Sequence, residues 1–151
     1  MSRGGGGPRM GLSDDTTLDD LEKAWTERVQ EAQALAARFP ATALALRLYV
    51  LEIRIKAIIC KRLSLVKLPN HCKIHDLDEL IIFAGLITEL DDPKNAEIRR
   101  NWDDLVAFAS KQLDKLRYLP GSAWPPADLN KYLAALDDPT SGIWTWLSRL
   151  P

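Results

Sequence analysis

Residues 42–63 read TALALRLYVLEIRIKAIICKRL, and the pattern of this stretch decides the fold class. Its apolar residues recur at spacings of three and four, which is the period of an α-helix. They form one wide face and continue around the rest of the helix: Leu44, Leu48, Leu51, Ile55, Ile58 and Ile59, widened by Leu46, Val50 and Ile53. A helix that is apolar on so many sides is typical of the centre of a helical domain.

The basic residues of this helix are also regularly placed. Arg47, Arg54 and Lys61 recur every seven residues, so they lie on one side of the helix, two turns apart. Residues 47–73 hold seven Lys and Arg against one acid, whereas residues 76–104 hold nine acids. Two interpretations stay open: this basic stripe binds phosphate groups, or it pairs with acidic residues on neighbouring helices.

The rest of the chain predicts further helices on either side of residues 42–63. Apolar stripes, capping residues and prolines place them at about 18–39, at 75 to 85 or 87, at 94–119, at 126–137, and after 141. No stretch alternates apolar and polar residues with a period of two, so no sheet is expected. We therefore predict an all-α fold: an antiparallel up-and-down helical bundle of four long helices plus one or two short C-terminal helices.

The composition fits a single domain. The chain has 151 residues, 46% of them hydrophobic, with a formal net charge of −1 and a pI near 6.1. Residues 14–151 can bury one core, whereas residues 1–13 contain a run of glycines and are expected to form a disordered tail. A net charge so close to zero gives no general attraction to nucleic acid or acidic membranes. No stretch is apolar enough to predict a transmembrane span, so no membrane partner is expected.

The cysteines and histidines predict no metal site. Cys60 and Cys72 do not form a disulfide framework, which fits a reduced cytoplasmic protein. A zinc site at His71, Cys72 and His75 would have only three ligands and lacks the usual ligand spacing. We therefore expect neither a metal ion nor another cofactor.

Three blocks of sequence carry a family resemblance. They read ALRLYVLEIRIKAII at residues 45–59, HDLDELI at 75–81 and LDKLRYLPG at 113–121, followed by a proline-bearing connector and a closing helix. Together they resemble the HEPN domain family (higher eukaryotes and prokaryotes nucleotide-binding), over roughly residues 18–150. The resemblance implies a helical bundle that forms homodimers, serves toxin–antitoxin or defence systems, and often pairs with a nucleotidyltransferase.

Active members of that family cut RNA with an Arg-x4–6-His motif, and this sequence departs from it. The histidines are His71 and His75, and the nearest upstream arginine, Arg62, lies nine positions before His71. We therefore expect no catalytic residue and interpret the chain as a non-catalytic binding module of a bacterial toxin–antitoxin or defence system. It would form a homodimer and bind a nucleotide, an RNA or a protein such as a nucleotidyltransferase. The alternative is a ribonuclease toxin with a non-standard site at His71 or His75 with Arg62.

The remaining candidates are ligand contacts and interface residues. The ligand candidates are Arg47, Arg54, Lys61, Arg62, His75, Arg117 and Tyr118. His75 and Asp76 could form an acid–base pair, but Asp76 as a helix N-cap is the favoured interpretation. Arg117 and Tyr118 either line a pocket or simply stabilise a helix end. Trp144 and Trp146 cannot both face one side of a short helix, so one should reach the surface. Together with Trp124, they are the interface candidates.

Overall fold

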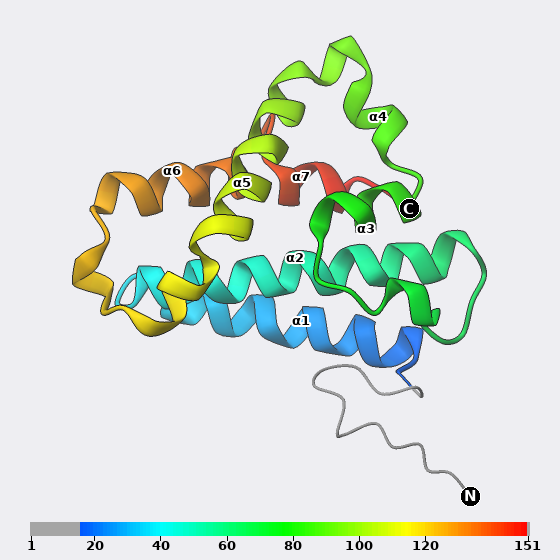
Figure 1. Ribbon diagram of the computed structural model, residues 1–151, viewed down its shortest axis with the longest axis horizontal. Helices are drawn as coiled ribbons and strands as arrows, with labels where there is room; N and C mark the ends of the chain where they lie inside the picture. Colours follow the sequence, from blue (N-terminus) through cyan, green and yellow to red (C-terminus); the bar gives the residue numbers. More distant parts are fainter. Residues whose placement is uncertain (1–15, 151) are drawn as a thin grey trace, which may run out of the picture.

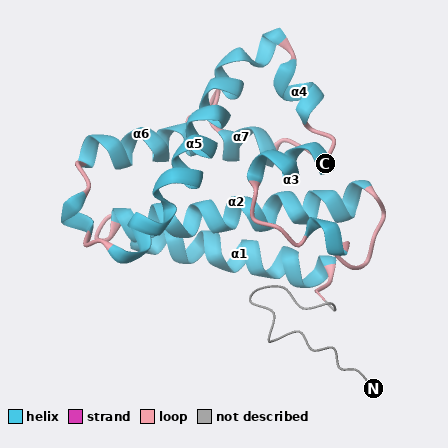
Figure 2. Cartoon of the chain, in the orientation of Figure 1, coloured by secondary structure: helices cyan, strands magenta, loops and turns pink. Residues whose placement is uncertain are grey.

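A computed structural model describes residues 16–150, and its regular elements are helical apart from one isolated bridge between Thr17 and Lys67 (Figure 2). The tail expected at residues 1–13 lies outside the described residues. Within residues 16–150 the α-helices are α1 (Leu18–Leu35), α2 (Pro40–Arg62), α3 (Leu77–Phe83), α4 (Ile87–Asp91), α5 (Ala96–Tyr118), α6 (Pro126–Asp137) and α7 (Ile143–Ser148). Single turns of 3₁₀ helix lie at Asn70–Cys72, Pro93–Asn95 and Gly121–Ala123. The all-α class is confirmed.

The first two helices form an antiparallel hairpin along one side of the molecule (Figure 1). α1 begins at a capping box, in which the Thr17 hydroxyl accepts a hydrogen bond from the Asp20 amide at 3.1 Å. The Asp20 carboxylate in turn accepts one from the Thr17 amide at 3.0 Å. Pro40 begins α2, where the missing N–H of proline breaks no helical hydrogen bond.

α2 lies in the middle of the fold, as its sequence predicted. Fifteen of its 23 residues are buried, and α1, α3, α5 and α6 all pack against it. Leu44, Leu51, Ile55 and Ile59 are completely buried. The position of α2 matters for function because each neighbouring helix contacts a different side of it.

The predicted third helix is shorter than expected, and an additional short helix follows it. α3 has seven residues and ends before Gly85, whose φ of +72° is a conformation that residues with side chains rarely adopt. α4 follows with five residues. In the described part of the chain the long helices are therefore α1, α2 and α5, with 18, 23 and 23 residues, instead of the four expected.

The third long helix, α5, does not continue the hairpin. It runs steeply across α2 in the view of Figure 1, while α6 lies above the first part of α2 and α7 passes close to α5. An up-and-down order of four long helices is therefore not confirmed. Among the described helices, none combines the length and apolar character that crossing a bilayer requires.

One side chain ties α5 to the start of α3. Trp102 of α5 is completely buried, and its indole Nε1 donates a hydrogen bond to Asp78 Oδ1 at 3.0 Å. This contact positions α3 beside α5, so that the two helices and α2 surround a common space.

Candidate functional site

Arg47, the first residue of the basic stripe, is turned into the protein. Its guanidinium donates hydrogen bonds to both carboxylate oxygens of Asp137 in α6, at 2.8 and 2.5 Å, and only 5% of the residue is exposed. The guanidinium also lies over the Trp144 ring of α7, at 5.6 Å from its centroid. Arg47 therefore joins α2 to α6 and α7.

The other two residues of the stripe face α1. Arg54 is 7% exposed, lies 5.0 Å from the centroid of the Trp25 ring and is 3.8 Å from Glu22 Oε1. Its burial lowers the pKa of the guanidinium, and the nearby Glu22 carboxylate opposes that effect. Lys61 Nζ lies 3.3 Å from the same Glu22 oxygen. Of the two interpretations of the stripe, the structure favours pairing with acidic residues on neighbouring helices.

Neither Trp144 nor Trp146 reaches the surface as an exposed side chain. Trp146 is buried, and Trp144 packs edge-on against Trp25 with ring centroids 5.6 Å apart. Trp124 is half-buried and packs edge-on against Phe108 at 5.8 Å. The expectation of an exposed tryptophan was wrong because α7 packs against α5 and α6, while Trp144 also contacts Trp25 of α1 and Arg47 of α2.

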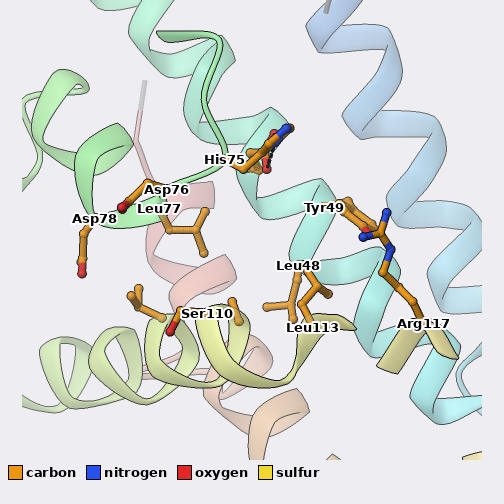
Figure 3. A pocket seen from close by; sticks show the side chains of 12 residues that line it. Leu48, Tyr49, His75, Asp76, Leu77, Asp78, Ser110, Leu113 and Arg117 are labelled. Atoms are coloured by element: carbon orange, nitrogen blue, oxygen red, sulfur yellow. Dashed lines mark hydrogen bonds and ion pairs between the residues drawn. The ribbon is translucent and has the colours of Figure 1, made fainter. Parts of the chain in front are cut away.

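A groove of about 500 Å³ lies between α2, the start of α3 and α5 (Figure 3). We call it the α2–α3–α5 groove. Its lining residues are Leu48, Tyr49, Glu52, His75, Asp76, Leu77, Asp78, Val106, Ala109, Ser110, Leu113 and Arg117. Because the floor is made of aliphatic side chains and the polar groups stand around it, the groove has the composition of a binding site.

Two of the carboxylates in the groove already hold the structure together. Asp76 caps α3, where Oδ1 accepts a hydrogen bond from the Glu79 amide at 3.1 Å, so the N-cap prediction is confirmed. Asp78 accepts the hydrogen bond from Trp102. Both side chains are nevertheless exposed, so their negative charge faces whatever enters the groove.

His75 is paired with a residue that the sequence did not suggest. Its Nδ1 lies 3.1 and 3.0 Å from the two carboxylate oxygens of Glu52. Glu52 Oε2 also accepts a hydrogen bond from Lys56 Nζ at 2.8 Å, and Lys56 is 1% exposed. The His75 side chain is 78% exposed. A buried cation, a carboxylate and an exposed imidazole therefore form a row at the edge of the groove. The i,i+4 spacing of Glu52 and Lys56 is typical of such an ion pair, but nothing in the sequence linked His75 to it.

Arg117 marks another part of the groove. Its guanidinium lies 5.8 Å from the centroid of the Tyr49 ring and 6.0 Å from that of Tyr118. Tyr118 is exposed next to the groove, but is not part of its lining. The Tyr49 hydroxyl is buried and has no hydrogen-bond partner within residues 16–150.

Arg62 is separate from the groove. It donates hydrogen bonds to the carbonyl oxygens of Ala84 and Gly85, at 3.3 and 3.4 Å, and lies 3.4 Å from Glu89. It therefore stabilises the C-terminal end of α3, whereas His75 precedes the N-terminal end. The structure does not bring together the His75 and Arg62 of the ribonuclease alternative.

The residues weighed as zinc ligands each have other surroundings. His71 packs edge-on against Phe83 with ring centroids 5.3 Å apart, Cys72 is buried, and His75 is held by Glu52. Burial raises the pKa of the thiols of Cys60 and Cys72, which makes them poor nucleophiles and ligands. Across residues 16–150, no three His, Cys, Asp or Glu side chains gather in a way that could hold a metal ion.

Comparisons with known proteins do not assign the chain to a family. No protein-family model, no curated protein and no solved structure matches it. The chemistry of the α2–α3–α5 groove and the sequence resemblance are what bear on its function.

Proposed function

We propose that this chain is a non-catalytic HEPN-like binding module of a bacterial toxin–antitoxin or defence system, and that the α2–α3–α5 groove holds its partner. The observation that carries the proposal is the groove itself, an aliphatic floor bordered by His75, Arg117 and three carboxylates. Most of these polar groups are already hydrogen-bonded or ion-paired within the chain. Groups held in this way fit a binding site better than a catalytic one.

The placement of charge supports a protein partner over a nucleotide or RNA. Arg47 and Arg54, which an RNA-binding stripe would need, are buried and next to acids. Asp76 and Asp78 place two exposed carboxylates at one end of the groove, and these repel phosphate groups. A nucleotidyltransferase is one protein partner that the family resemblance implies.

Homodimer formation remains part of the proposal. Several large apolar side chains are exposed, with Val66 and Tyr118 the most accessible. Exposed aromatic and aliphatic groups of this kind are common at protein interfaces. They take the place of Trp124, Trp144 and Trp146 as interface candidates, since none of these three is exposed.

A fluorescent probe tests whether the groove is open to a ligand. We expect 1-anilinonaphthalene-8-sulfonate to bind the natively folded chain, because its rings fit an aliphatic floor and its sulfonate suits Arg117. Ser110→Trp should weaken binding about tenfold, because the indole would cover the groove from an exposed position. Fluorescence titration measures both affinities.

Ala107→Trp is the matched control. Ala107 is exposed on the same helix but does not line the groove, so an indole there should leave the affinity unchanged. Near-ultraviolet circular dichroism checks that each variant keeps its packed core. Equal binding to all three proteins would rule out the groove as the probe's site.

The row formed by His75, Glu52 and Lys56 favours a second candidate function, a ribonuclease. Glu52 holds Nδ1 of the imidazole, which leaves Nε2 free to exchange a proton with a substrate. Under our first proposal the purified chain leaves a labelled RNA intact, and His75→Ala changes nothing. RNA cleavage that disappears in His75→Ala would replace the binding module with the ribonuclease.

A further inference from the structure

The α2–α3–α5 groove carries opposite charges at its two ends. Asp76 and Asp78 stand at one end, Arg117 stands at the other, and Leu48 and Leu113 lie between them (Figure 3). The third carboxylate, Glu52, contributes little net charge because it is paired with buried Lys56 at 2.8 Å. An occupant of this groove therefore meets a negative end, an apolar middle and a positive end.

The length of the groove can be read along α5. The lining residues Val106, Ala109, Ser110, Leu113 and Arg117 follow one face of that helix. From Val106 to Arg117 a helix rises about 16 Å, which is about three turns. A second helix of the same length would lie along this face and reach both charged ends.

The walls of the groove favour a helix over an extended peptide. They consist of α2, α3 and α5, whose backbone groups are largely hydrogen-bonded within their own helices. An extended peptide would find no sheet edge there, and its N–H and C=O groups would be buried against aliphatic side chains without partners. A helix satisfies these groups itself and can pack its side chains between those of the walls.

We propose that the α2–α3–α5 groove binds one amphipathic helix of a partner protein, in a fixed direction. This helix places Lys or Arg beside Asp76 and Asp78, apolar side chains over Leu48 and Leu113, and Asp or Glu beside Arg117. The proposal rests on the binding function proposed above, and it specifies the partner of the same site.

A selection from random peptides tests the proposal without choosing a partner protein in advance. The full chain is immobilised and challenged with displayed peptides of about sixteen residues, which exceed the groove by about one turn. We expect the enriched peptides to share apolar residues at positions i, i+3 or i+4, and i+7, with a basic residue at one end and an acidic residue at the other. The Ser110→Trp variant should bind them about tenfold more weakly, and Ala107→Trp should bind them as the wild type does.

A charge swap tests the direction of binding. Arg117→Glu should weaken binding of a selected peptide about tenfold, because the acidic residue of the peptide would then face a carboxylate. Changing that residue of the peptide to Lys should restore the affinity for Arg117→Glu. The variant should fold normally, since Arg117 is half exposed and its ion pair with exposed Asp114 spans 3.4 Å.

Three results would overturn the proposal. They are no enriched peptide, enriched peptides without the charge pattern, or a peptide affinity that neither Ser110→Trp nor Arg117→Glu changes. Self-association of the chain that Ser110→Trp abolishes would assign the groove to a second copy instead. If the fluorescent probe still binds the groove while no peptide does, the helical partner is wrong and the proposed binding site survives. If the probe does not bind there either, both fail.

Discussion

Glu52→Ala is expected to lower the free energy of unfolding by about 3 kcal/mol, because it leaves a buried ammonium group without a counter-ion. Lys56 is 1% exposed, and its Nζ lies 2.8 Å from Glu52 Oε2. Urea denaturation followed by circular dichroism measures the change.

Two further variants separate the charge effect from the loss of packing. Lys56→Met keeps most of the buried volume and removes the charge, so Glu52→Ala combined with Lys56→Met should recover most of the lost stability. Glu97→Ala is the matched control, since Glu97 and its partner Arg100 are both exposed, and it should cost less than about 0.5 kcal/mol. A double variant no more stable than Glu52→Ala alone would show that the buried charge is not the cause.

The sequence was sufficient to predict most helices because their signals are local. The apolar spacing of residues 42–63 and the position of Pro40 place α2 to within a few residues. An end of the third helix at Gly85 was one of the two predicted ends, and α3 stops two residues earlier. The separate helix α4 was missed because the apolar pattern continues past Gly85 to Leu86. Glycine at that position was visible, but its positive φ depends on how α3 and α4 pack.

The functional residues were harder to predict because their partners are distant in the chain. The seven-residue spacing correctly placed Arg47 and Arg54 on one side of α2, but could not say what faces that side. Arg47 is paired with Asp137, ninety positions further along. His75 was identified as a candidate, and its partner Glu52 emerged only from the fold.

Two sides of α2 carry charged residues with different roles. Arg47 and Arg54 face α1, α6 and α7, where stacking on Trp144 and Trp25 and pairing with acids fix the helices against one another. Tyr49 and Glu52 face the groove. Because Arg47 and Arg54 serve packing, the recognition that we propose uses a groove whose charges are few and opposite, which suits a protein partner.

Trp102→Ala is expected to be the second strongly destabilising change, with a loss of about 4 kcal/mol. The indole is completely buried between α5 and the other helices, so truncation leaves a large cavity. Trp102→Phe should be less destabilising, because phenylalanine fills most of the space of the indole. Loss of the hydrogen bond to Asp78 should contribute about 1 kcal/mol to its cost. Thermal or urea unfolding monitored by circular dichroism gives both values.

The phenylalanine variant also links this core residue to the groove. Asp78 would lose the hydrogen bond that holds its carboxylate at the negative end, so peptides selected on the wild type should bind Trp102→Phe several times more weakly. Trp124→Phe is the matched control, since the Trp124 indole Nε1 has no hydrogen-bond partner within the described residues. It should lose little stability and no peptide affinity. If Trp102→Phe bound the peptides as tightly as Trp124→Phe does, Asp78 would not need Trp102 to act at the negative end of the groove.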